Sequence, residues 1–221
     1  MDSRPTAPDG SWLPLLPLNA VLFPDGMLPL KIFEARAVDM VRQCMRTDQP
    51  FGVVLLKNGK ENTTAVDLES MGCIANIVDW EMPQMGVLHL RARGGSRFHI
   101  RQTRVTESGR IEAQVVVLAP QLADAGTAKP STVASDVHLR CARALKRVID
   151  DLHLKHLGGT EKPADTPFSH PIRLDDAGWV ADRWCEILPI PLIARQKLLE
   201  LGDPEIRLSI VLKFLLQHQA L

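Results

Sequence analysis

The chain divides into two halves by the spacing of its apolar residues. Up to residue 119, short apolar runs alternate with turn residues, a pattern typical of β-strands. From residue 131, apolar residues recur every three or four positions, a pattern typical of helices. The stretch between is rich in alanine, proline and glycine and has no periodic pattern. We therefore predict a β-rich unit over 12–119, a linker over 120–130 and a helical unit over 131–221.

One helix is predicted within the β-rich half. Phe33, Ala37, Val41 and Cys44 are spaced by four, four and three residues, so they would form the apolar stripe of a helix over 34–45. Glu34 would lie in the first turn, where the helix dipole favours an anion. Short strands are expected at 51–56, 71–80, 86–93, 97–106 and 115–118.

The segments 86–93 and 97–106 carry the clearest alternation of apolar and polar residues. A period of two with one apolar face indicates strands that are buried on one side. We predict that they form an antiparallel hairpin that turns at Gly94-Gly95-Ser96. Several such strands in succession imply a small curved sheet or an open barrel.

The second half is predicted to contain four helices. The first runs from about Thr132 to Leu152, and the second begins near Asp175, a good N-cap, and ends before Pro189. The third starts at Pro191, and the fourth is capped by Asp203. Short connections between the last three favour a compact bundle.

Three motifs in a fixed order are the most specific feature of the sequence. They are LLPLNAVLFP at 15–24, LPLKIFEAR at 28–36 and GSRFHI at 95–100. The helical half adds QKLLE at 196–200 and Arg207-Leu208. Together these segments resemble the amino-terminal substrate-binding domain of the ATP-dependent Lon protease, whose signatures include PL-x-IFE-x-R and G-x-RF-x-[IV]. The chain departs from the first signature at Ala37, where the family often has an aromatic residue.

The resemblance implies an α+β fold, with a PUA-like, β-rich open barrel followed by an α-helical bundle. It also implies that the chain is a module that holds unfolded or extended polypeptides. The signature residues themselves are expected to be structural, with Ile32 and Phe33 in the core, because apolar motifs usually pack. A carboxylate–guanidinium contact of Glu34 or Arg36 with a partner elsewhere would fix the bend between strand and helix.

The sequence carries no motif for catalysis. Gly59-Lys60 is followed by Glu61, so the hydroxyl that a P-loop needs for Mg²⁺ is absent. Ser96 follows two glycines, but no G-x-S-x-G elbow surrounds it. We therefore expect a non-enzymatic protein without a cofactor, whose link to proteolysis would run through a separate protease or ATPase.

Trp80, Met82 and Met85 form the preferred binding candidate. They fall in 79–85, which is predicted to be the tip between two strands. Tips are normally small and polar, whereas flexible methionine surfaces suit loose recognition of varied apolar peptides. The alternative is that this loop folds back and caps an open end of the barrel.

A strip of arginines is a second candidate. Alternation places Arg91, Arg93, Arg97 and Arg101 on one outward face, which could hold an acidic peptide or RNA. An RNA-binding PUA-like protein is therefore the alternative function. The chain has 26 basic and 26 acidic residues, and this zero balance argues against nucleic acid and favours a solvated sheet face.

The remaining chemistry points to a structural role in a reducing compartment. Cys44, Cys73, Cys141 and Cys185 lie in apolar stretches without metal-binding spacing, so they are predicted to be buried free thiols. His153 and His156 lack a third ligand at a recognised spacing, so no metal site is expected. No signal peptide or membrane span is evident in the sequence, so we expect a cytoplasmic protein.

Overall fold

The computed structural model describes residues 12–57, 67–119, 135–157, 168 and 171–218, with the side chains of 153–157 excepted. The chain divides into two compact units, Met1–Pro120 and Gln121–Leu221. The predicted linker over 120–130 lies outside the described residues. Strands in the first unit and helices in the second give the mixed α+β fold that was predicted. The PUA likeness and the bundle geometry stay predictions.

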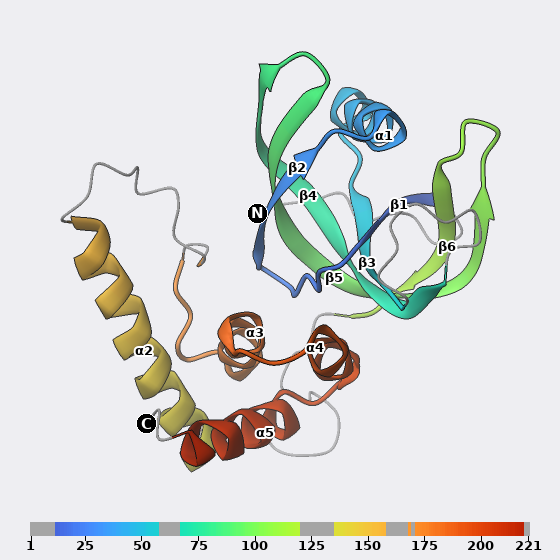
Figure 1. Ribbon diagram of the computed structural model, residues 1–221. Coiled ribbons are helices and arrows are strands. Elements are labelled where there is room, and N and C mark those ends of the chain that lie inside the picture. Colours follow the sequence, from blue (N-terminus) through green and yellow to red (C-terminus); the bar gives the residue numbers. More distant parts are fainter. Residues whose placement is uncertain (1–11, 58–66, 120–134, 158–167, 169–170, 219–221) are drawn as a thin grey trace. The chain divides into compact units, whose positions relative to one another are not determined.

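The first unit contains a six-stranded sheet and one helix (Figure 1). In chain order the elements are β1 (Trp12–Leu18), β2 (Met27–Ile32), α1 (Ala35–Thr47), β3 (Phe51–Leu56), β4 (Leu68–Gln84), β5 (Val87–Val105) and β6 (Ile111–Val117). The strand order is β2-β5-β4-β3-β1-β6, and β5 also pairs with β6. This second pairing closes five of the strands into a ring, while β2 pairs only with β5 among the described strands. β1 and β3 are parallel, and the other pairs are antiparallel.

Two apolar clusters cover opposite faces of the sheet. Cys73 and Ala75 of β4 belong to one cluster, whereas Ile74 between them belongs to the other. Successive residues of a strand point to opposite faces, so the sheet is buried on both sides at this point. The first cluster includes the buried face of α1, with Val38 and Val41 among its members. The predicted helix is therefore confirmed, although it begins at Ala35 and its stripe does not include Phe33.

β5 is one continuous strand, so the predicted hairpin with a turn at Gly94-Gly95-Ser96 is wrong. Gly94 N donates a hydrogen bond to Gly26 O at 2.8 Å, and Asp25 N donates one to Gly94 O at 2.9 Å. A Cβ atom at Gly94 would lie 1.9 Å from the carbonyl oxygen of Phe23. Glycine is needed here because a second backbone segment approaches closely, and the chain does not reverse.

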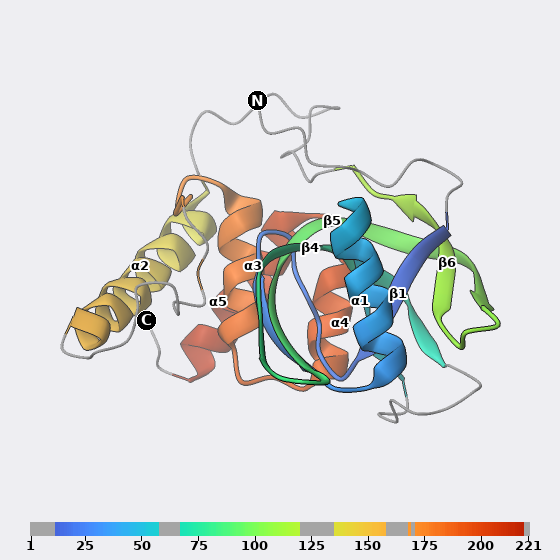
Figure 2. The ribbon, with the colours of Figure 1, turned by 90° about the horizontal axis from the view of Figure 1, so that it is seen from above.

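The second unit contains the four expected helices, α2 (Asp136–Leu157), α3 (Ala177–Ile187), α4 (Leu192–Glu200) and α5 (Pro204–Gln217). α3 packs against α5, and α2 packs against both (Figure 2). The N-cap of α5 is Asp203 as predicted, but the N-cap of α3 is Asp176 and not Asp175. Among the described residues, no helix is both long enough and apolar enough to cross a membrane.

A buried ion pair joins two helices of the second unit. Arg207 of α5 lies 3.1 Å from the Asp182 carboxylate of α3, and both side chains are almost fully buried. Arg207 also donates a hydrogen bond of 2.9 Å to the carbonyl oxygen of Leu201, just beyond α4. Arg207 and Gln196, which carried part of the family resemblance, are therefore buried and support packing.

Candidate functional site

The predicted binding residues Trp80, Met82 and Met85 lie at the far end of the β4–β5 hairpin. Their exposed fractions are 52%, 39% and 97%. The predicted turn over 79–85 is too long, because β4 continues to Gln84 and only Met85 and Gly86 connect the two strands. Gly86 has φ of +82°, a conformation that glycine adopts without strain. The hairpin tip therefore exposes apolar side chains from the end of a strand, where the register against β5 is irregular.

Trp80 lies on the side of β4 that faces α1. It pairs with Leu90, which belongs to the same apolar cluster as Val41 of α1. The register of β4 against β5 shifts between Ile77 and Asp79, and this shift decides which residues of the strand end turn toward the helix. Trp80 lines two neighbouring pockets beside α1, with volumes of about 800 and 520 Å³.

The four arginines of the predicted strip do not share one outward face. Arg91 and Arg93 are half-buried and Arg101 is exposed, but Arg97 is only 6% exposed. The reason is the register shift within β5, where Gly94 lies opposite Ala75 and Arg97 lies opposite Cys73. Three steps along β5 match two along β4, so alternation counted through this bulge assigns Arg97 to the wrong face.

Two arginines of β5 are held by carboxylates within the unit. Arg93 binds Asp25 with its Nη2 atom 2.7 Å from Oδ1, and this pair fixes the loop that crosses Gly94. Arg104 binds Glu112 at 2.6 Å and stacks over the Trp12 ring at 3.9 Å. The predicted strip is therefore not continuous, because Arg97 is buried and Arg93 is paired with Asp25.

Phe33 contradicts the prediction that the signature residues lie in the core. Ile32 is buried as predicted, but Phe33 is 74% exposed. Glu34 and Arg36 pair with each other, with Arg36 Nε 3.0 Å from Glu34 Oε1, and within the described part of the chain neither forms an ion pair with any other residue. Phe33, Glu34 and Arg36 line one edge of a pocket of about 530 Å³ whose other walls include Leu16 and Leu30. Half of the signature is therefore surface, because Ile32 ends β2 and the next residue points the other way.

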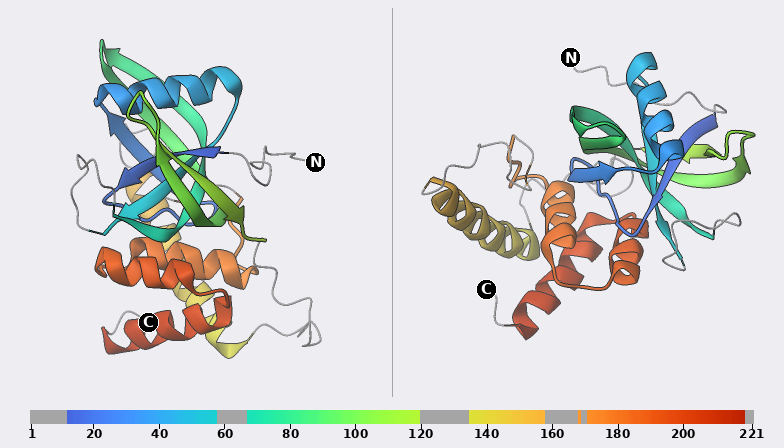
Figure 3. Two further views of the ribbon diagram at one scale, coloured as in Figure 1. Left: turned by 90° about the vertical axis from the view of Figure 1, so that its right-hand side faces the viewer. Right: turned by 45° about the horizontal axis from the view of Figure 1, so that its top comes forward.

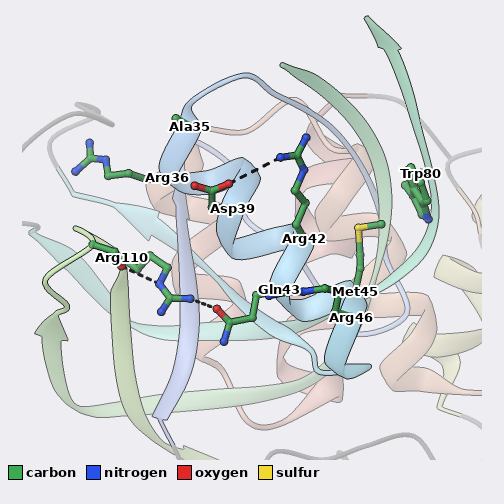
Figure 4. A pocket seen from close by; sticks show the side chains of 10 residues that line it. Ala35, Arg36, Asp39, Arg42, Gln43, Met45, Arg46, Trp80 and Arg110 are labelled. Carbon is green, nitrogen blue, oxygen red and sulfur yellow. Dashed lines mark hydrogen bonds and ion pairs between the residues drawn. The ribbon is translucent and has the colours of Figure 1, made fainter. Parts of the chain in front are cut away.

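The outer face of α1 is a group of residues that the sequence prediction missed. Arg42 and Arg46 are exposed one turn apart, and Arg110 from the β5–β6 turn reaches Gln43 of the same helix and lines the same pocket (Figure 4). The i, i+4 spacing of two arginines on the polar face of a predicted helix is a signal that was available. No such signal pointed to Arg110, because this residue is far from α1 in the sequence.

The four cysteine side chains are shielded from solvent. All four cysteines are free and buried, as predicted. Burial raises the pKa of the Cys185 thiol to about 12 and the pKa of the Cys44 and Cys141 thiols to about 11. These three groups therefore stay protonated at neutral pH and are poor nucleophiles.

His153 and His156 have a spacing that can place two imidazoles on one metal, and their side chains lie outside the described residues. Within the described part of the chain, no group of three or more histidine, cysteine, aspartate or glutamate side chains is placed to hold a metal ion. The predicted absence of a metal at the two histidines therefore stays a prediction.

Comparison with known proteins identifies the family. The chain matches the family model of the ATP-dependent protease La (LON) substrate-binding domain over residues 12–217. This match spans both units of the fold. The chain therefore belongs to the Lon substrate-binding domain family, which confirms the resemblance carried by the ordered motifs.

Curated relatives are much longer than this chain. Lon protease 2 of Myxococcus xanthus is 28% identical over 207 residues, which cover 92% of this chain and 23% of the relative. Lon protease of Parabacteroides distasonis is 30% identical over 199 residues, which cover 88% of this chain and 22% of the relative. The chain thus spans less than a quarter of the length of these relatives, and the match is to their substrate-binding domain.

Solved structures match over nearly their whole length. The Lon N-terminal domain protein from Xanthomonas campestris has a TM-score of 0.69 and 30% identity, with 92% of this chain and 98% of that chain covered. The N-terminal domain of Lon protease from the Mycobacterium avium complex has a TM-score of 0.58 and 16% identity, with 92% and 97% covered. The second likeness concerns the fold alone.

Proposed function

We propose that this chain is a non-catalytic module that binds unfolded or extended polypeptides at the tip of the β4–β5 hairpin. The observation that carries the proposal is the exposure of Trp80, Met82 and Met85 on a domain of a substrate-binding family. Exposed apolar side chains at one tip gain free energy when a client covers them. Methionine adapts its shape, so such contacts tolerate many client sequences.

The role proposed is that of the substrate-binding domain alone, because this is the family that the chain matches. A client that the domain captures would pass to a protease or ATPase that degrades it, as the similarity to the substrate-binding domain of Lon proteases suggests. The four free, buried cysteines favour a location in the cytoplasm, which is a reducing environment.

The test replaces the two methionines with serine in one variant, Met82→Ser with Met85→Ser. Capture of reduced, alkylated α-lactalbumin, a permanently unfolded protein, should weaken about tenfold, because about 1.4 kcal/mol of lost apolar contact corresponds to that factor. Fluorescence anisotropy of the labelled client measures the dissociation constant.

The control is Ile210→Ser, which removes an exposed apolar side chain from the helical unit. Ile210 is 43% exposed, close to the 39% of Met82. This variant should bind the client as the unchanged protein does. Equal affinity of the methionine variant and the unchanged protein would place the binding site elsewhere.

A further inference from the structure

The outer face of α1 is the floor of a groove. Figure 1 and the right-hand view of Figure 3 show α1 between the β4–β5 hairpin and the β5–β6 hairpin. The pocket on this face has a volume of about 800 Å³, and it is lined from α1, from Trp80 of β4 and from Ser108 and Arg110 of the β5–β6 turn. This space is much larger than the ~30 Å³ that one water molecule occupies, so it has room for several side chains of a ligand.

Positive charge is concentrated in this groove. Its lining holds four arginines, Arg36, Arg42, Arg46 and Arg110, against a single carboxylate, Asp39. Asp39 lies 4.0 Å from Arg42, and Glu34 pairs with Arg36 at the edge. The chain as a whole has equal numbers of basic and acidic residues, so this excess is local.

Arg110 is held in position by neutral partners. It donates hydrogen bonds to the Gln43 side chain of α1 and, at 3.1 Å, to the Ser108 hydroxyl oxygen (Figure 4). Neutral partners orient the guanidinium without cancelling its charge. Arg42 and Arg46 are exposed on the same side of α1, and all three arginines line the same pocket.

The wall opposite Arg110 is apolar. Trp80 is half exposed and stands on the α1 side of β4, and the half-buried Met45 lies near it in the same pocket (Figure 4). The groove thus combines a basic floor with an aromatic wall. A ligand that fits both parts carries carboxylates next to apolar side chains, and a polypeptide supplies this combination.

We infer that the α1 groove binds acidic segments of polypeptide, with aspartate or glutamate side chains on Arg42, Arg46 and Arg110 and an adjacent apolar side chain on Trp80. The inference rests on the proposed function and narrows its substrate class to clients that mix apolar and acidic residues. Guanidinium groups suit this role because they bind carboxylates with two parallel hydrogen bonds. Nucleic acid fits less well, because its affinity comes from many phosphate contacts and this groove has an excess of only a few charges.

The test compares short synthetic peptides that share their apolar residues and differ only in carrying Glu, Gln or Lys at the other positions. Anisotropy with the full chain should show that the Glu peptide binds about fivefold more tightly than the Gln peptide, because exposed ion pairs are individually weak. The Lys peptide should bind most weakly. The preference should shrink as salt rises from about 0.05 to 0.5 M, because salt screens exposed charges.

The variant Arg42→Gln with Arg46→Gln should abolish the preference for Glu and leave binding of the Gln peptide unchanged. Its matched control is Arg143→Gln with Arg147→Gln, two exposed arginines at the same spacing on α2, which should keep the preference. All four substitutions are on helix surfaces, and circular dichroism verifies that each variant folds.

The outcomes separate this inference from the proposed function. Equal binding of the Glu and Gln peptides overturns the inference and leaves the proposed function intact. Absence of binding to all three peptides overturns the proposed function and the inference with it. Tighter binding of a single-stranded RNA oligonucleotide, lost in the Arg42/Arg46 variant and not in the control, overturns the inference in favour of nucleic acid.

Discussion

At Gly94 two backbone segments approach so closely that no side chain fits between them. The backbone of Asp25 and Gly26 exchanges hydrogen bonds with both sides of Gly94, and Arg93 holds the Asp25 carboxylate. Asp25 has φ of +59°, a conformation that few residues other than glycine adopt readily. The contact therefore joins the loop before β2 to the middle of β5.

Replacement of Gly94 by alanine should lower the free energy of unfolding by about 1–3 kcal/mol, because the new Cβ forces the Phe23 carbonyl to move. Urea denaturation followed by circular dichroism measures the change. The control is Gly95→Ala on the same strand, where the nearest atom is the end of the Asn76 side chain at 3.1 Å and can move aside. Equal denaturation midpoints for the two variants would contradict this account.

At the scale of elements, β5 decides which side chains of the first unit reach the surface. β2 pairs with its first part and β6 with its last part, while β4 pairs with it from Val87 to His99. The bulge between these parts moves Ala92 and Phe98, both at even positions, into different apolar clusters. Arg97 is buried for the same reason. A bulge of this kind bends the strand, so that β5 can pair first with β2 and then with β6.

The cap of α3 offers a test at one helix end. Asp176 accepts a hydrogen bond of 3.0 Å from the Trp179 backbone N–H, whereas its neighbour Asp175 is not the cap. Asp176→Ala should therefore lower the free energy of unfolding by about 1 kcal/mol. Asp175→Ala is the control and should leave it nearly unchanged. Thermal unfolding of both variants distinguishes them, and a larger loss for Asp175→Ala would show that the helix begins one residue earlier.

At the scale of the molecule, each unit contains its own apolar core. The first unit has two clusters, one around α1 and one around Phe98 and Ile74. In the second, Leu145, Leu208 and Leu215 are fully buried side chains. A unit with its own core can fold by itself.

Residues 12–119, expressed alone, should therefore fold and show a β-type circular dichroism spectrum. The unfolding of this fragment in urea should be cooperative, because its core is complete within the fragment. The full chain is the reference for the comparison. A fragment that lacks a cooperative transition would show that the helical half is required for the first unit to fold.

Periodicity predicted the elements with a local cause and failed where contacts were distant. The strand over 51–56 was predicted from a short apolar run, and all of its residues are buried. The four helices of the second half were predicted because their apolar residues repeat at the spacing of one helix face. The turn at Gly94–Ser96 was predicted wrongly, because glycine permits close backbone approach as well as chain reversal. The sequence alone did not reveal that the loop at Phe23 crosses β5.

The candidate site shows the same division. Trp80, Met82 and Met85 were selected from the sequence because apolar residues are unusual near a predicted tip, and all three are exposed. The arginines of α1 were not selected, since their significance depends on Arg110, which arrives from the β5–β6 turn. Phe33 was assigned to the core because it fitted a helical stripe, but the helix begins after it.

By itself the sequence determined the α+β class, the succession of a strand-rich half and a helical half, and the family, because apolar periodicity and ordered motifs are local properties of the chain. Only the tertiary structure decided which arginines are buried, which are paired and which line a groove. These outcomes depend on a bulge in β5, on the loop that crosses Gly94 and on the two hairpins beside α1. Each brings together residues that are distant in the chain, and no spacing along one segment records such a contact.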